Sequence, residues 1–315
     1  MRLYSETVFV RPDDSFTAER KTCHLLKKGI VGIFGPRSPS TSEHVRSIAD
    51  NMDIPFIETR PNYNLGKGIH ITMLLLMRIP GLILDNSYVV NVHPDVSSLS
   101  RIYLDLLEAY DWRTVTVLYQ DNNSLKKLKQ IFHKTARMTE KFRLVVKQLR
   151  PNSNGYRDVL RETYQSKSKL IILDCEREIL PSVLKQAQQI GLISAGYSFL
   201  LTSIDSHTLN MEELKHGGTN FSWVELVDSS REEVRAVAGM LGVTTLDSTM
   251  ALLYDAVVTF SLALTQLQAV QRLSETPLDC SGEFSWSWGN SLTNYMKVGL
   301  WSLVIRLGSP QLLIV

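Results

Sequence analysis

The chain has 315 residues, of which 44% are hydrophobic and 21% charged, and this composition is that of a globular protein and excludes a disordered one. Its 34 basic and 32 acidic residues leave a net charge of +2, so no global field attracts nucleic acid or an anionic membrane, and partners must be recognised locally. The three cysteines, Cys23, Cys175 and Cys280, lack the paired spacing of a zinc site, so we predict no metal or other cofactor.

Neither a signal peptide nor a membrane-spanning helix is predicted. The first ten residues lack a basic segment followed by an apolar stretch and a small-residue cleavage site. A spanning helix needs about 20 consecutive apolar residues. The nearest segment, 69–84, is too short, and Arg78 and Pro80 interrupt it.

The first predicted element is a helix that begins near Ser15 and ends at Gly29, with Phe16, Cys23 and Leu26 on roughly one side.

A buried strand at 30–34 and a Gly-Pro turn at 35–36 follow this helix. Ser40 and Glu43 then have the spacing of a capping box, which predicts a helix start. Apolar residues at 45, 48, 49 and 52 predict that a second amphipathic helix continues from there.

The rest of the chain alternates short apolar runs with segments of helical period, apart from a lapse at about 61–86. Such alternation indicates βαβ units and parallel sheets covered by helices on both faces. The predicted strands are 54–57, 88–92, 114–119, 142–149, 170–173, 198–201 and 221–227, and the predicted helices are 99–110, 125–132, 159–160, 179–190, 230–240 and 250–264.

So many alternating units exceed the share of one sheet, and we therefore predict two doubly wound α/β lobes. The first part of lobe 1 is expected at 1–110 and lobe 2 at 111–240. Residues 241–297 are expected to return to lobe 1 with a terminal helix, and 298–315 form an unassigned tail.

The sequence has none of the compact motifs that mark common active sites. GxSxG, GxxxxGK[ST] and HExxH are absent, and Gly66 and Gly68 form only a GxG fragment that is typical of a turn. We predict no catalytic residue. An α/β enzyme would rest on the fold class alone, which says nothing about chemistry.

The turn at 35–38 leads into a helix start, where exposed N–H groups and the positive end of the helix dipole can bind an anion. Ser38 and Ser40 are therefore candidate cleft residues for the carboxylate of an amino acid, and the alternative is a simple strand-to-helix connection. Two N-x-S/T sequons, at Asn122 and Asn220, lie beside predicted strand ends and are candidate glycosylation sites of a secreted protein.

Several segments together resemble the amino-terminal domain of ionotropic glutamate receptor subunits, in the kainate-like branch that includes insect muscle receptor subunits. They include FGPRSPS at 34–40, IPFIETR at 54–60, DWRTVTVLY at 111–119 and LYDAV at 253–257. The resemblance covers most of residues 1–297 in one order, and the combination is specific although each motif alone is weak.

The resemblance implies a clamshell like that of type I periplasmic binding proteins, held on the extracellular, postsynaptic face of the plasma membrane above an agonist-binding domain and a pore. In the family this domain mediates dimerisation and assembly with other glutamate receptor subunits, as a homodimer or heterodimer through lobe 1, and in the kainate-like branch it does not bind the neurotransmitter. The alternative is a bilobed binding protein or receptor ectodomain that closes on an amino acid or similar small ligand.

Individual residues acquire expected roles from the same resemblance. Cys23 matches a cysteine that the family bonds to one near the end of the domain, here Cys280, which implies an oxidising compartment. Cys175 matches a free core thiol. The dimer contact of the family corresponds to Phe16, Glu19, His44 and Ser47 on the first two helices. The alternative for Phe16 is that it packs inward.

The sequence differs from the family at its two ends and in one loop, and these differences predict departures from the family fold. The family has a strand and a helix before the segment that opens here, and further strands after Lys297, so we expect a clamshell truncated at both ends. An apolar insertion lies between Asn64 and Asn86, and the tail at 298–315 has no counterpart in the family.

Overall fold

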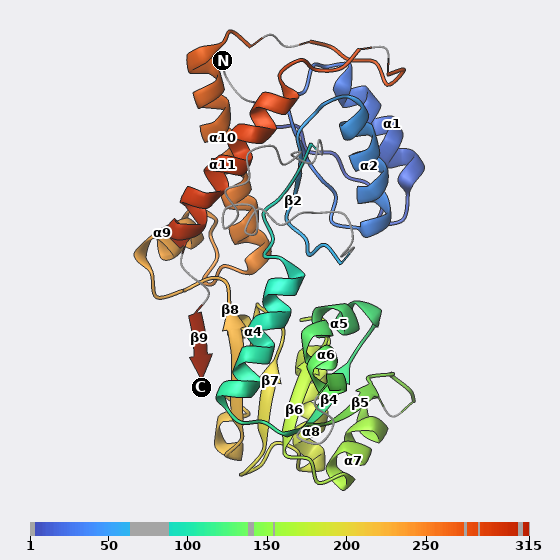
Figure 1. The fold of residues 1–315 in the computed structure, drawn as a ribbon, viewed down its shortest axis with the longest axis vertical. Helices are drawn as coiled ribbons and strands as arrows, with labels where there is room; N and C mark the ends of the chain where they lie inside the picture. Colours follow the sequence, from blue (N-terminus) through green and yellow to red (C-terminus); the bar gives the residue numbers. More distant parts are fainter. Residues whose placement is uncertain are drawn as a thin grey trace. The chain divides into compact units, whose positions relative to one another are not determined.

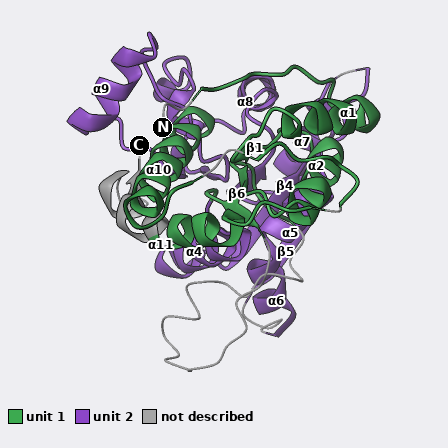
Figure 2. Ribbon diagram, turned by 90° about the horizontal axis from the view of Figure 1, so that it is seen from above, with its two compact units in different colours: residues 1–93, 249–306 green, residues 94–248, 307–315 purple. Residues whose placement is uncertain are grey.

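The computed structural model describes residues 4–63, 88–137, 142–153, 155–273, 276–282, 284–307 and 311–314, and the side chains as far as residue 298. The apolar insertion, the interrupted apolar segment at 69–84 and the Gly66–Gly68 fragment lie outside the described residues. The chain divides into two compact units (Figure 2). Unit 1 comprises residues 1–93 and 249–306, and unit 2 comprises residues 94–248 and 307–315.

Unit 1 contains a three-stranded parallel sheet in the order β1-β2-β3, whose middle strand β2 is labelled in Figure 1. The strands are short: β1 is Ile33–Phe34, β2 is Phe56–Glu58 and β3 is Val89–Asn91. The strand predicted at 30–34 is thus confined to its last two residues. The backbone there runs close to a helix, since a Cβ added at Gly32 would lie 2.5 Å from the ring of Phe260.

The helices of unit 1 are α1 (Ser15–Leu26), α2 (Pro39–Asn51), α10 (Ser248–Val270) and α11 (Gly289–Leu307). Asp14 caps α1 by accepting a hydrogen bond from the backbone N–H of Thr17 at 2.9 Å. The buried stripe of α1 is Ala18, Thr22 and Leu26, spaced four residues apart. The predicted stripe was therefore wrong in part, because Phe16 lies outside it and is exposed.

The predicted start of α2 at Ser40 was also wrong. The helix begins at Pro39, and Ser38 is its N-cap residue without a side-chain cap bond. Proline suits the first helical position, because it has no backbone N–H to satisfy and its φ angle is already helical. The helix therefore starts earlier than the capping-box spacing of Ser40 and Glu43 indicated.

Helix α10 meets the length and hydropathy of a membrane-spanning helix, the one helix to do so in the described part of the chain. Helices in the core of a soluble protein also meet these limits, and α10 places Ala256, Phe260, Ala263 and Leu267 in the core of unit 1. The rest of that core comes from α1, α2, the sheet and α11, and includes Leu26, Val45, Phe56, Ile57, Val90, Leu292 and Met296.

Unit 2 contains a six-stranded sheet in the order β5-β4-β6-β7-β8-β9. Neighbouring strands are parallel except β9 (Gln311–Ile314), which is antiparallel to β8. The unassigned tail therefore contributes the end of α11 and this edge strand. The other strands are β4 (Thr114–Tyr119), β5 (Arg143–Gln148), β6 (Leu170–Asp174), β7 (Ser198–Leu201) and β8 (Asn220–Glu225).

Helices cover both faces of the unit 2 sheet, so each face has its own core. Val115 and Val117 of β4 belong to one core, and Leu118 belongs to the other, as expected for alternating side chains on a strand. The helices that contribute to these two cores are α4 (Val96–Ala109), α6 (Lys129–Arg137), α7 (Arg157–Gln165) and α8 (Leu180–Ile190). Unit 2 also contains α5 (Asn122–Lys127) and α9 (Glu232–Met240), whose described residues belong to neither core.

The division between the units differs from the predicted lobe boundary at residue 110. Unit 2 already begins at Pro94, because α4 packs with that sheet. Tyr103 and Leu107 of α4 are buried in the same core as Val115, and the Tyr103 hydroxyl donates a hydrogen bond to the Thr202 carbonyl oxygen at 2.9 Å. The parallel strands and the helices on both faces of the sheet confirm the α/β fold class.

Candidate assembly surface and disulfide

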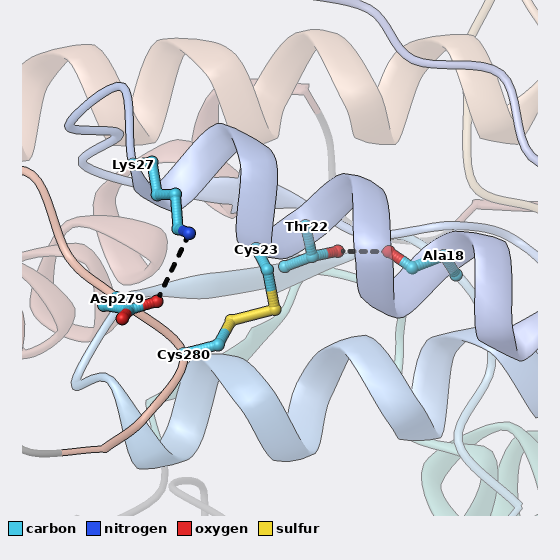
Figure 3. The surroundings of a disulfide bond; sticks show 6 residues. All are labelled: Ala18, Thr22, Cys23, Lys27, Asp279 and Cys280. Carbon is cyan, nitrogen blue, oxygen red and sulfur yellow. Dashed lines mark hydrogen bonds and ion pairs between the residues drawn. A yellow bond between two sulfur atoms is a disulfide. The ribbon is translucent and has the colours of Figure 1, made fainter.

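The disulfide between Cys23 and Cys280 is present in the structure (Figure 3). Its Cα atoms are 5.6 Å apart, within the normal range for such a bond. It ties α1 to the segment at 276–282, which is also held by a hydrogen bond from the Leu278 N–H to the Leu26 carbonyl oxygen at 3.0 Å. An exposed ion pair of 3.6 Å joins Lys27 to Asp279 beside it.

This bond connects two parts of unit 1 that are far apart in the sequence. The sequence separation is 257 residues, and the whole of residues 94–248 in unit 2 lies between the two cysteines. The remaining cysteine, Cys175, is free and buried. Burial raises the pKa of its thiol to about 12, so it stays protonated and unreactive.

Helices α1 and α2 pack side by side and carry the predicted dimer residues (Figure 1). Glu19 of α1 and His44 and Ser47 of α2 are all exposed. Phe16 is 73% exposed, which contradicts the alternative in which it packs inward. The neighbouring helices thus present an aromatic ring, a carboxylate, an imidazole and a hydroxyl to solvent.

The hydroxyl groups of the candidate cleft residues Ser38 and Ser40 already make hydrogen bonds within the chain. Both hydroxyls donate to the carbonyl oxygen of Pro12, and the Ser40 hydroxyl also lies 3.2 Å from the Asp13 carboxylate. These bonds hold the segment before α1 against the start of α2. The nearby carboxylate also disfavours a bound anion, so the geometry fits a structural connection better than a grip on a ligand.

A buried carboxylate that the sequence reading missed lies at the carboxyl end of β2. Glu58 is 3% exposed, accepts a hydrogen bond from the Ser42 hydroxyl at 2.7 Å and pairs with Arg60 at 3.0 Å. Asn91, at the end of β3, donates to the Arg60 carbonyl oxygen. A ligand carboxylate at this edge would have to compete with Glu58 for Arg60. The sequence feature that could have indicated this pair is the position of Glu58 and Arg60 at the end of the apolar run predicted as a strand.

A second buried pair lies at the carboxyl end of the unit 2 strands. The Lys127 ammonium group is 2.8 Å from the Asp174 carboxylate and 3.3 Å from the Thr202 hydroxyl. Burial alone would raise the pKa of Asp174, but Lys127 and hydrogen bonds from Ser124 and Thr202 outweigh it and hold that pKa below its usual value. The pair is internally neutralised, so we assign it a structural role.

Both sequons begin at exposed asparagines. Asn122 is the first residue of α5 and Asn220 the first residue of β8. The serines of these sequons, Ser124 and Ser222, are buried. Ser124 belongs to the capping box of α5, in which Asp121 accepts from its backbone N–H at 3.0 Å. Neither asparagine is sterically enclosed, and occupancy by a glycan remains a prediction.

The described residues contain no cluster of three or more His, Cys, Asp or Glu side chains that could hold a metal ion.

Comparison with known proteins places this architecture in a family. The model of the family described as the receptor family ligand binding region matches residues 6–301. Mouse "Glutamate receptor ionotropic, kainate 1" is 28% identical over 305 residues, which covers 91% of this chain and 34% of that protein. The human protein of the same name is 27% identical, with 91% of this chain and 31% of that protein covered.

The chain spans about one third of the length of these curated relatives. The matched region includes most of both units and the disulfide. Because the family model covers most of its length, the chain belongs to the family of receptor ligand-binding regions and is an α/β domain of the kind found at the amino terminus of kainate-type ionotropic glutamate receptors.

Proposed function

We propose that this chain is the extracellular amino-terminal domain of a glutamate-gated cation channel subunit, and that its role is non-catalytic: it mediates the pairing of subunits. The partners are other glutamate receptor subunits, joined through α1 and α2 of unit 1. The location is the extracellular face of a postsynaptic plasma membrane. The kainate receptor relatives and the disulfide, which requires an oxidising compartment, support this proposal.

The single observation that carries the proposal is the exposed ring of Phe16. Aromatic side chains are the commonest anchors of protein interfaces, where a few of them supply most of the binding energy. Fully burying a Phe side chain contributes about 1.5–3 kcal/mol. Phe16 is 73% exposed in the single chain, so most of this gain is still available to a partner.

The surroundings of Phe16 suit an interface between copies or close relatives of this chain. Glu19 lies three residues further along α1 and is exposed, and His44 and Ser47 are exposed on α2. They can form the polar rim that usually surrounds an apolar centre. The disulfide fixes α1 to a segment of unit 1 that is distant in the sequence, so the surface around Phe16 is held in place before a partner binds.

The alternative function, closure on an amino acid, has weaker support. Its candidate residues, Ser38 and Ser40, already donate hydrogen bonds to the segment before α1. Calorimetric titration with glutamate and other amino acids tests this alternative directly, and a heat of binding at micromolar ligand concentrations would favour it over assembly.

Sedimentation equilibrium of the secreted 315-residue chain tests the proposed function. We expect a reversible dimer that Phe16→Asp weakens by at least ~100-fold, since a loss of about 2.7 kcal/mol changes Kd by that factor. Met240→Asp is the matched control, because Met240 is 70% exposed but lies on α9 of unit 2.

Two results would overturn the proposal. One is a chain that stays monomeric at the highest concentrations reached. The other is a dimer that Met240→Asp weakens as much as Phe16→Asp does, because the contact would then not depend on α1. Circular dichroism and the melting temperature of each variant establish that the chain is folded.

A further inference from the structure

The charge of this nearly neutral chain is unevenly distributed. Residues 122–150 contain 9 of the 34 Lys and Arg residues but only one of the 32 acidic residues. The remainder of the chain therefore has 25 basic and 31 acidic residues and is net acidic. The basic segment comprises α5, α6 and the edge strand β5, which lie together at one side of the unit 2 sheet (Figure 1).

Some of these cations are neutralised within the fold. Lys127 pairs with Asp174, Lys134 with Glu108 on α4, and Lys147 with Glu162 on α7. These side chains hold unit 2 together and are not available to a partner.

Three other cations, which lie on α5 and α6, form a group that we call the basic face: Lys126, Lys129 and Arg137. All three are exposed, and within the described residues none lies within ion-pair distance of a carboxylate. Lys129 and Arg137 are eight residues apart on α6, and both are exposed, whereas Ile131 of the same helix is buried. A helix rises about 1.5 Å per residue, so these two charges are separated by roughly 12 Å along its axis.

Charged residues at a sheet edge often serve only to prevent pairing with another strand. That role accounts for Arg143 and Lys147 on β5. It does not account for Lys126 and Lys129, which lie on helices rather than on the edge strand.

We propose that the basic face binds a linear sulfated polysaccharide of the cell exterior. Lys129 and Arg137 lie at the two ends of α6 and do not converge on one point, which suits an extended polyanion better than a small anion. The disulfide places the chain in an oxidising compartment, whereas nucleic acid and anionic lipid headgroups are concentrated on the cytoplasmic side of membranes. Outside the cell, the linear polyanion that remains as a candidate is a sulfated polysaccharide.

The proposal makes no use of the dimer surface. The basic face lies in unit 2, whereas α1 and α2 belong to unit 1. Polysaccharide binding and dimerisation can therefore fail independently, and a variant of one site serves as a control for the other.

Heparin binding by the full 315-residue chain, measured against salt concentration, tests the inference. We expect retention at ~0.15 M salt and a linear fall of log affinity with log salt, with each cation contributing a slope of about 0.7 if heparin resembles single-stranded nucleic acid. The triple variant K126Q, K129Q and R137Q should lower the slope by about 2 and the affinity at ~0.15 M salt by at least ~10-fold.

The matched control is K185Q, R235Q and R272Q, which removes the same charge from exposed positions on α8, on α9 and after α10. It should bind heparin within about twofold of the parent chain, since it leaves the basic face intact. A rescue variant, Lys126→Arg with Lys129→Arg, retains the charge and should retain binding.

Three results would overturn the proposal. The first is no retention of the parent chain at ~0.15 M salt, where specific contacts should survive. The second is an equal loss in the control and in the triple variant, which indicates a general charge effect. The third is displacement by polyglutamate as effective as displacement by heparin, which indicates an acidic peptide as the occupant.

Discussion

Removal of the disulfide should destabilise unit 1 and leave unit 2 unchanged. The perturbation is the double substitution of Cys23 and Cys280 by Ser. Since the bond links two discontinuous segments of unit 1, we expect the loss to appear in α1 and in the segment at 276–282.

The magnitude follows from the loop that the bond closes. If the whole chain unfolds, the loop of 257 residues gives a chain-entropy stabilisation of about 5.5 kcal/mol. If unit 2 stays folded, the flexible part of the loop shortens to residues 24–93 and 249–279, roughly 100 residues, and the stabilisation is about 4.7 kcal/mol. Both values are upper limits, because other contacts also hold this segment to α1. Leu278 is buried, and its N–H donates a hydrogen bond to the Leu26 carbonyl oxygen, and neither contact depends on the disulfide. We expect a loss of about 2–4 kcal/mol.

Hydrogen exchange followed by mass spectrometry at increasing urea concentration measures this loss by segment. Peptides from α1 (Ser15–Leu26) should lose protection at lower urea in the variant, and peptides from α8 (Leu180–Ile190) should not. Cys175→Ser is the control, since Cys175 is a free thiol of unit 2. Equal stability of α1 in the parent and the variant, or an equal loss in α8, would refute the reasoning.

Three further predictions concern buried charges and glycans. Lys127→Met should destabilise unit 2 by about 3–5 kcal/mol at pH 7, because Asp174 is left buried without its counter-ion. Without Lys127 the pKa of Asp174 rises, so the variant takes up this proton at a higher pH than the parent, and urea titration should show the difference in stability shrinking as pH falls through the raised pKa of the variant. Asp255→Asn should raise the melting temperature at pH 7.5 and leave it unchanged near pH 4. Burial raises the pKa of Asp255 to about 6, so between about pH 4 and 6 the folded parent chain binds more protons than the unfolded chain. The stability of the parent chain therefore falls as pH rises over this range, and that of the variant does not. Glycopeptide mapping of the chain secreted from insect cells should find glycans at Asn122 and Asn220, and their absence from both would count against the exported form.

The local pattern of apolar and polar residues predicted the bounds of those strands and helices that end at polar residues, turns, proline or glycine. The strands at 114–119 and 198–201 have the predicted bounds, because each apolar run is flanked by polar residues or turns. Helix α8 was predicted within a residue of its ends, since a proline starts it and Gly191, with a φ of 91°, ends it.

Tertiary contacts decided the features that the pattern missed. Strand β1 is shorter than the apolar run predicted, and its Phe34 contacts Phe260 of α10, more than 200 residues later in the chain. Helix α4 belongs to unit 2 because its buried residues meet β4. The pair of Lys127 and Asp174 joins residues 47 positions apart, so no local spacing indicates it. The disulfide was expected only through resemblance to a family, since three cysteines allow three pairings.

The central claim is that the exposed ring of Phe16 becomes buried when two subunits meet. Hydroxyl-radical footprinting of the chain below and above its dimerisation concentration measures the solvent exposure of that ring directly. We predict that the labelling rate of Phe16 falls several-fold at the higher concentration, while Tyr164 on α7, which is 47% exposed, is labelled at the same rate throughout. A dimer in which Phe16 remains as reactive as in the monomer would contradict the account.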